Sequence, residues 1–319
     1  MRLIAKLNPV ILVAVSGTLL ILLLASGAAM VVRRLHPSPL SDEIRKRIRT
    51  WWLIASLFLG MLLPGRAVTI GFLAFLSFLA LKEYFSLIPV RRVDRRVLFY
   101  AYAAILVQYA WVYSNWYGMF AIFIPVYMFL FLTLRMVISG ETAGFHTAVG
   151  TLHWGLMTAV YSLSHLGALL LLPFRGGSAW VSQPTGGITL LLYLAALTQL
   201  NDVWQFLWGK CLGRSKVIPN VSPNKTWAGL IGGICTTTVL SVALAPYLTP
   251  LTRMEAVMAG ALIGLAGFFG DISVSALKRD LHIKDTGTIL PGHGGILDRV
   301  DSLTFTAPLF FHLVRYQHF

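Results

Sequence analysis

The chain has 319 residues, of which 57% are hydrophobic and only 12% are charged, and its mean hydropathy is +0.74. Ordinary soluble domains carry about 25% charged residues, so this composition excludes a typical soluble protein and indicates an integral membrane protein. The net charge of +14 does not indicate a nucleic-acid binder, because the charges lie in short gaps between apolar runs. We expect a lipid bilayer and phosphate-bearing substrates as partners, and no nucleic acid.

Nine apolar runs predict an all-α, polytopic integral membrane protein with about nine transmembrane helices. Crossing a bilayer takes about 20 residues, and the runs are Pro9–Val32, Trp51–Leu63, Ala67–Leu81, Val97–Tyr113, Tyr117–Leu134, Thr151–Pro173, Gly187–Leu200, Trp227–Leu248 and Met254–Gly270. A shorter run follows at Leu303–Val314. Only Pro64-Gly65-Arg66 separates the second and third runs, so these are two spans or a re-entrant hairpin, and we count them as spans.

The lysines and arginines between the runs predict that the N-terminus lies outside. With that orientation the outer side keeps only Arg2, Lys6, Arg66, Arg175 and Arg253, while nearly all other basic residues face the cytoplasm. The alternative for the first run is a signal peptide cleaved near Ala25–Ala29. Cleavage there would export the arginine-rich gap after Val32, which disfavours it.

Three regions follow from this pattern. Residues 1–96 form an N-terminal transmembrane region with basic cytoplasmic loops, 97–150 a middle transmembrane region, and 151–319 a C-terminal region that carries the candidate chemistry. The two long polar segments, Asn201–Thr226 and Asp271–Ser302, are expected to face the cytoplasm together. The two cysteines, Cys211 and Cys235, match no metal-ligand spacing and are expected to be free thiols.

A dense cluster of charges of both signs lies between Asp271 and Asp301. One ionisable group at the centre of a membrane costs about 2.5 to 3.5 kcal/mol, so this cluster predicts a water-filled cavity or an interfacial site with a function. If the helix of the ninth run continues, Asp271, Ser275 and Lys278 share one face. A solvated loop of mixed charge is the alternative interpretation.

Asp298 and Asp301 are three residues apart at the start of the last apolar helix, so their carboxylates share a face and repel each other unless a cation joins them. Magnesium is the natural cation for hard oxygen ligands beside phosphates. The glycines of Pro291–Gly295 allow close backbone approach and positive φ, which lets amide groups face a phosphate. His293, taken alone, is as well explained by packing or capping.

The segment Val221–Trp227 precedes a long apolar helix. Ser222 and Pro223 mark a turn, and Lys225 lies near the helix N-terminus, a geometry that favours phosphate. A plain cytoplasmic loop explains this segment equally well when it is taken alone. Upstream, Asp202 ends the seventh run, where an aspartate is more often functional than structural.

The stretch Ser275–Asp301 reads S-x-L-K-R-x-x-x-x-K-D-x-G-x-x-L-P-x-H-G-G-I-x-D-R-V-D. It resembles the signature of the phosphatidate cytidylyltransferases, or CDP-diglyceride synthases. The resemblance implies transfer of a cytidylyl group from CTP to phosphatidate in phospholipid biosynthesis, at a bacterial inner membrane, with an active site open to the cytoplasm. It also implies Mg²⁺, a second, monovalent cation, and a homodimer formed through the middle region.

Carried over by position, the resemblance implies catalytic roles for Asp271, Lys278, Asp298 and Asp301, with the three aspartates around the metal. The implied substrate-binding residues are Ser222, Lys225, Ser275, Arg279, Lys284, Asp285, His293, Gly294, Gly295 and Arg299. Two departures border the expected nucleotide pocket: Ala228 replaces a usual glutamate, and Val203-Trp204-Gln205 replaces small or hydroxyl residues.

Three other functions compete with this interpretation. A CTP-dependent lipid-alcohol kinase would transfer the γ-phosphate and would need a base, but the complete signature argues against it. A transporter would also place charges in membrane segments, but the charges gather near one end of the chain and no inverted repeat is apparent. A catalytically reduced paralogue that binds nucleotide or lipid remains open because of Ala228.

Overall fold

The computed structural model describes residues 9–35, 39–62, 64–172, 186–287 and 294–319, and the regular structure in these ranges is helical. The helices are α1 (Pro9–Leu35), α2 (Pro39–Leu62), α3 (Arg66–Leu87), η2 (Arg92–Asp94), α4 (Arg95–Tyr113), α5 (Tyr117–Ile122), η3 (Phe123–Met128), α6 (Phe129–Val137), α7 (Phe145–Leu156), η4 (Met157–Ser162), α8 (Leu163–Leu169), α9 (Gly186–Leu212), α10 (Trp227–Leu248), α11 (Arg253–Asp280) and α12 (Leu297–His318). The all-α prediction is confirmed.

Two long helical segments each contain a π-helical turn: η3 joins α5 to α6, and η4 joins α7 to α8. Five helical stretches among the described residues are long and apolar enough to cross a membrane: Val15–Leu35, Arg66–Leu87, Tyr117–Val137, Trp227–Leu248 and Arg253–Asp280. The chain is therefore expected to be a membrane protein, while the count of nine spans and the outward N-terminus stay predictions.

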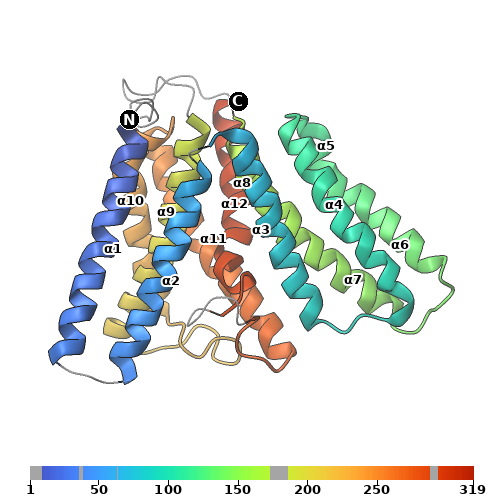
Figure 1. The fold of residues 1–319 in the computed structure, drawn as a ribbon, viewed down its shortest axis with the longest axis horizontal. Helices are drawn as coiled ribbons and strands as arrows, with labels where there is room; N and C mark the ends of the chain where they lie inside the picture. The colour runs from blue at the N-terminus through green and yellow to red at the C-terminus, as the bar shows by residue number, and fades with distance from the viewer. Residues whose placement is uncertain (1–8, 36–38, 63, 173–185, 288–293) are drawn as a thin grey trace.

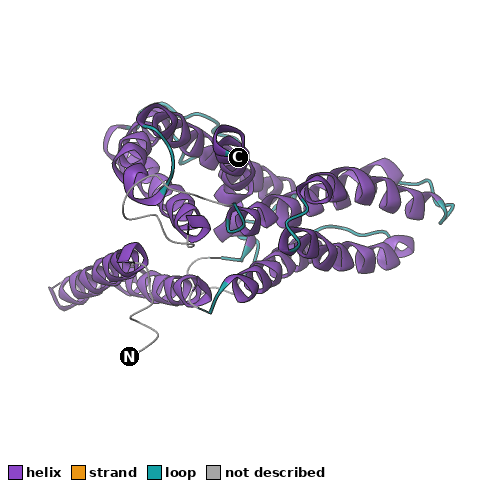
Figure 2. Ribbon diagram, turned by 90° about the horizontal axis from the view of Figure 1, so that it is seen from above, coloured by secondary structure: helices purple, strands orange, loops and turns teal. Residues whose placement is uncertain are grey.

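The helices that carry the signature form one bundle. Helix α10 packs between α9 and α11, and α12 packs against α11 (Figure 1). Helices α3 and α8 also contact α12, and the segments from α4 to α7 form an arm that projects away from this bundle (Figure 2). The loop between α9 and α10 lies at the opposite end of the molecule from the start of α1 (Figure 1). The two long polar segments thus meet at one end.

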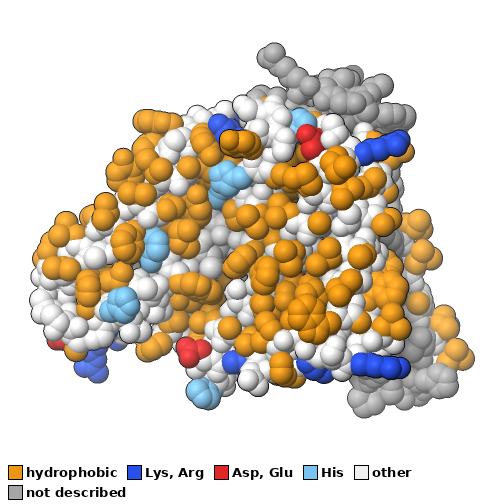
Figure 3. All heavy atoms as spheres, turned by 180° about the vertical axis from the view of Figure 1, so that it is seen from behind, with side chains coloured by type: hydrophobic (Ala, Val, Ile, Leu, Met, Phe, Trp, Pro, Cys, Tyr) orange, Lys and Arg blue, Asp and Glu red, His pale blue; other side chains and the backbone are white. Residues whose placement is uncertain are grey.

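The surface of this fold is apolar over most of its height. Seen from behind, hydrophobic side chains cover the broad middle, while lysine, arginine and acidic side chains gather toward the two ends (Figure 3). Large side chains such as Leu106 and Val239 are about 70% exposed in the middle of their helices. In water such exposure would be costly, so a hydrocarbon environment suits this surface.

Close packing of α11 on α12 brings two aspartates near each other. A Cβ at Gly270 would collide with the backbone carbonyl of Asp301 and would lie 2.9 Å from Ser302 Cα, so only glycine permits this approach. Asp271 follows Gly270 directly. The contact therefore positions Asp271 beside the start of α12.

Candidate active site

Lys225 lies at the centre of the candidate site, in the loop before α10. Its Nζ is 2.6 Å from Oδ2 of Asp271 on α11 and 3.1 Å from Oε1 of Gln205 on α9. It also lies 5.7 Å from the ring centroid of Phe268. Burial acts to lower the pKa of Lys225, but the carboxylates of Asp271 and Asp202 outweigh this effect and raise the pKa above its ordinary value. Lys225 is therefore charged near neutral pH.

Three aspartates from three helices surround this ammonium group. Asp202 on α9, Asp271 on α11 and Asp301 on α12 lie close enough to repel one another, and Lys225 attracts all three. Arg299 attracts Asp202 and Asp301. Three carboxylates thus face two cationic side chains, so the cluster keeps an excess of negative charge when all are ionised.

Serine hydroxyls fix two of these carboxylates. Ser275 Oγ donates to Oδ1 of Asp271 over 3.3 Å, which agrees with the predicted shared face of Asp271 and Ser275 on one helix. Ser302 Oγ lies 3.2 Å from Oδ2 of Asp202. The first contact lies within α11, and the second joins α12 to α9.

The loop that carries Lys225 is ordered by its own backbone. The Lys225 N–H donates to the carbonyl of Ser222 over 3.2 Å, and the Val217 N–H donates to the carbonyl of Lys225 over 3.1 Å. Arg279 Nε donates to the carbonyl of Val221 over 3.2 Å, which ties the loop to the end of α11. The predicted residues Ser222, Lys225 and Arg279 therefore belong to one structural unit.

Asp298 lies apart from the other aspartates in a separate hydrogen-bond network. Its Oδ1 is 2.7 Å from Nζ of Lys278. Its Oδ2 accepts the backbone N–H of Thr286 over 2.8 Å, the Thr286 hydroxyl over 2.9 Å and the Gly295 N–H over 3.1 Å. In this arrangement both oxygens of Asp298 are engaged: Oδ1 contacts Lys278 on α11, and Oδ2 holds the segment before α12.

Gly294 allows that network to close. Its φ of 77° lies in the left-handed region, and a Cβ there would lie 2.5 Å from Oδ2 of Asp298. The positive φ expected for the glycine segment is therefore present. The amide groups of this segment were expected to face a phosphate, but the Gly295 N–H donates to Oδ2 of Asp298 instead. His293 lies outside the described residues, and Lys284 and Asp285 are exposed after α11.

Glu83, near the end of α3, joins this network from the N-terminal half of the chain. The side chain is buried, and its Oε2 accepts the Ile296 N–H over 2.8 Å. Its Oε1 accepts the Leu297 N–H over 3.1 Å and the hydroxyl of Thr286. The N-terminus of α12 favours a negative charge, so Glu83 caps that helix. Glu83 was not predicted as a site residue, although an acid just after the apolar run Ala67–Leu81 was an available signal.

The sequence pattern of the cytidylyltransferase family matches residues 45–317, which includes every described residue of this site. The chain belongs to the cytidylyltransferase family. The matched range thus extends from before Glu83 on α3 into the last turn of α12. Membership in this family supports a nucleotidyltransferase with CTP as a substrate.

Relatives of this cytidylyltransferase-family chain cover most of its length. The uncharacterized protein YnbB of Escherichia coli is 45% identical over 280 residues, which are 88% of this chain and 90% of YnbB. Phosphatidate cytidylyltransferases of Staphylococcus aureus and Staphylococcus haemolyticus are 30% and 28% identical, over 82% of this chain and 96% of each relative. The resemblance identified from the signature is confirmed at the level of the family.

The oxygen atoms around Lys225 belong to carboxylates and hydroxyls, and the cluster carries excess negative charge. Oxygen atoms of these types are the ligands that a hard cation such as magnesium prefers. Among the residues placed in the structure, no three acidic, histidine or cysteine side chains are already arranged as the ligands of a metal ion. Asp298 is engaged by Lys278, Thr286 and Gly295. Magnesium binding by Asp271, Asp298 and Asp301 therefore stays a prediction.

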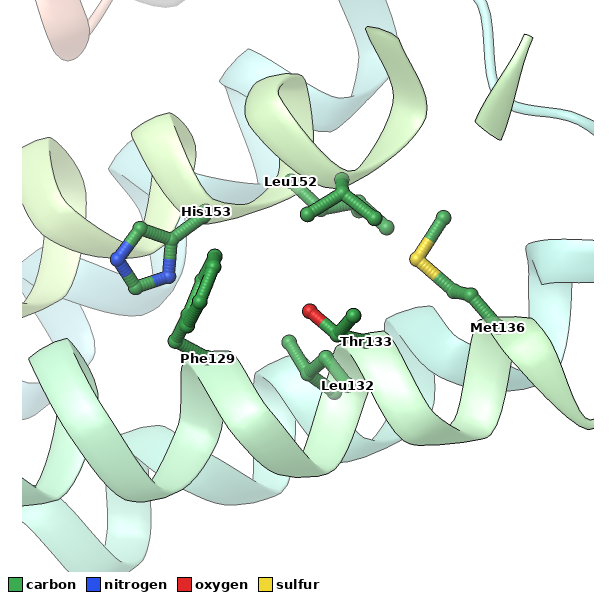
Figure 4. Close-up of a pocket in the computed structure, with 7 residues that line it drawn as sticks. Phe129, Leu132, Thr133, Met136, Leu152 and His153 are labelled. Atoms are coloured by element: carbon green, nitrogen blue, oxygen red, sulfur yellow. The ribbon is translucent and has the colours of Figure 1, made fainter. Parts of the chain in front are cut away.

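A small pocket elsewhere does not compete with this site. Phe129, Thr133 and Met136 of α6 face Leu152 and His153 of α7 across it (Figure 4). Its lining contains no aspartate, glutamate, lysine or arginine. A phosphate would find no cationic side chain there, so the pocket in the arm is not the candidate active site.

Proposed function

We propose that this protein is a phosphatidate cytidylyltransferase that converts CTP and phosphatidate into CDP-diacylglycerol and pyrophosphate. The observation that carries the proposal is the contact between Lys225 and Asp271. It joins the S-P-N-K segment before α10 to Asp271 on α11, four residues before the signature begins. Charged residues of both signs gather at this end of the bundle. A cationic group beside an acidic cluster suits a site that handles polyanions and a cation together.

In the proposed step, an oxygen of the phosphatidate phosphate attacks the α-phosphorus of CTP. A new P–O bond forms there, and the bond from the α-phosphorus to the oxygen bridging the β-phosphorus breaks. Pyrophosphate leaves with that electron pair. Because the attacking phosphate is already ionised near neutral pH, no strong base is needed, and the task of the site is positioning and charge neutralisation.

The residues of the site divide into two groups under this proposal. Lys225 lies on the loop before α10, and Arg279 at the end of α11 holds that loop. Both side chains face the phosphates of CTP in this proposal. Lys278 and Asp298 hold the segment that precedes α12. Ser222, Ser275, Lys284, Asp285, His293, Gly294, Gly295 and Arg299 complete the proposed substrate-binding surface.

Asp271 and Asp301, both predicted from the sequence, would hold magnesium in this proposal. Asp202 takes the place predicted for Asp298, because both oxygens of Asp298 are engaged by Lys278, Thr286 and Gly295. When bound, the ion supplies positive charge that stabilises the leaving pyrophosphate. The second, monovalent cation belongs to the same proposal, as do the homodimer through residues 97–150, the bacterial inner membrane and the cytoplasmic orientation of the site.

Of the competing functions, the lipid-alcohol kinase is disfavoured by the complete signature, which ends in Asp298-Arg299-Val300-Asp301. The reduced paralogue was suggested by Ala228. Lys225 nevertheless keeps two oxygen partners, from Gln205 and Asp271, without a glutamate at position 228. This arrangement favours an active enzyme.

The proposal is tested with purified protein in detergent, given CTP, phosphatidate and magnesium. We expect equal amounts of CDP-diacylglycerol, identified by mass spectrometry, and pyrophosphate. The Asp301→Asn variant is the inactive control. Folded wild-type protein that releases no pyrophosphate with phosphatidate would contradict the proposal.

A further inference from the structure

Gln205 lies on α9, in the stretch Val203-Trp204-Gln205 that borders the expected nucleotide pocket. It is 4% exposed, so its amide is shielded from water. Its Oε1 accepts a hydrogen bond from Nζ of Lys225 over 3.1 Å, and its Nε2 donates to the carbonyl of Gly264 over 3.4 Å. The two partners fix the amide in one orientation, because the reverse would point an NH₂ group at an ammonium and an oxygen at a carbonyl.

The neighbouring helix leaves space for this side chain. A Cβ at Gly233 on α10 would collide with Cγ of Gln205, and a Cβ at Gly229 would lie 2.6 Å from the Gln205 carbonyl oxygen. A glycine at each of these positions therefore lets α10 approach α9 closely. The Gln205 amide is held between α9, α10 and α11 before any substrate binds.

The chemistry of the two partners of Lys225 differs. Asp271 binds the ammonium through a carboxylate and cancels its charge, whereas Gln205 binds it through a neutral amide and leaves that charge intact. A phosphate binds the positive charge of a lysine, so the amide holds the ammonium group in place without weakening that attraction. We propose, on the basis of the proposed function, that Gln205 is a positioning residue that holds Lys225 for the phosphates of CTP.

Gln205 touches no substrate in this account and acts only through Lys225. A variant of Gln205 should therefore have no further effect once Lys225 is removed.

The test uses steady-state kinetics of the full-length protein in detergent. Gln205→Met matches the length of the side chain and removes the oxygen. We expect it to raise the KM for CTP about tenfold, equivalent to about 1.4 kcal/mol, while the KM for phosphatidate stays within about twofold. Trp208→Phe is the matched control, because it removes another hydrogen bond between α9 and α10, from Trp208 Nε1 to Thr236, without touching Lys225.

A double-mutant cycle separates positioning from general packing. Gln205→Met added to Lys225→Met should change the KM for CTP by less than about twofold, because the residue through which Gln205 acts is gone. Additive effects, or a rise in the KM for phosphatidate, would overturn the proposal. Gln205→Ala is a second variant with the same expected change, and loss of folded protein with both would also overturn it by making Gln205 a structural residue. If the wild type itself makes no CDP-diacylglycerol, the proposed function fails first.

Discussion

Glu83 accepts a hydrogen bond from the backbone N–H of Leu297, a residue 214 positions further along the chain. The same carboxylate accepts the N–H of Ile296 and the hydroxyl of Thr286, which also binds Asp298. One acid from the N-terminal half thus fixes the start of the helix that carries Asp298 and Asp301. The signature by itself is therefore not a self-contained unit, since α3 completes it.

Glu83→Gln should weaken the fold and the activity together. Both carboxylate oxygens accept N–H groups, and an amide would turn one acceptor into a donor that faces a donor. Leaving a buried donor unpaired costs about 1 to 3 kcal/mol. We expect a lower melting temperature in detergent and a loss of kcat. Glu141→Gln, at an exposed acid in the loop before α7, is the matched control and should change neither. Equal melting curves for the two variants would refute the capping role.

Asp298→Asn and Asp301→Asn should differ in stability although both lose activity. Asp298 holds Lys278, Thr286 and Gly295, so its amide variant leaves a buried network unsatisfied and should melt earlier. Asp301 is repelled by Asp271 and Asp202, so its amide variant should melt no earlier than the wild type. We expect kcat/KM to fall at least tenfold in both, or about 1.4 kcal/mol of transition-state stabilisation. The exposed Asp280→Asn serves as the control, and the same melting shift in both site variants would contradict this division.

Gly294→Ala should be more damaging than Gly140→Ala. The two glycines have nearly the same positive φ, 77° and 73°, so the backbone strain of an alanine is matched, at about 1 to 2 kcal/mol. A Cβ at Gly140 meets nothing within 4 Å, whereas a Cβ at Gly294 meets Oδ2 of Asp298. Only Gly294→Ala should therefore reduce activity. Indistinguishable melting curves and kinetics would show that the Asp298 contact does not matter.

The predicted membrane orientation can be measured with single cysteines in a Cys211→Ser, Cys235→Ala background. Ser114→Cys lies in the exposed turn between α4 and α5, and Asn220→Cys lies in the exposed loop before α10. An impermeant thiol reagent should label position 114 in intact cells and position 220 only after permeabilisation. The opposite pattern would reverse the orientation and place the site outside.

Local spacing predicted part of the geometry around the candidate site correctly. Asp271 and Ser275 are four residues apart on one helix, so their contact follows from helical geometry alone. The turn before α10 and the place of Lys225 next to the helix N-terminus followed from Ser222, Pro223 and the start of the apolar run. The positive φ of Gly294 was likewise expected from residue type.

Contacts between helices that are distant in the chain could not be predicted from the sequence. Nothing in the spacing links Gln205 to Lys225 or Glu83 to Leu297, because these pairs depend on how α3, α9 and α12 pack. The same limit applies to Asp298, whose pairing with Lys278 separates it from the other aspartates. Apolar runs gave the approximate positions of helices, but they did not reveal the π-helical turns at Phe123–Met128 and Met157–Ser162.

The position of the transferred phosphorus tests the central claim most directly. Purified protein is incubated with phosphatidate and magnesium, and with CTP labelled at either the α- or the γ-phosphate. Cytidylyl transfer predicts that the α-label enters the lipid fraction and that the γ-label is recovered in pyrophosphate. Entry of the γ-label into lipid would show phosphoryl transfer by a kinase, and wild-type protein that is folded but transfers neither label would contradict the proposed activity.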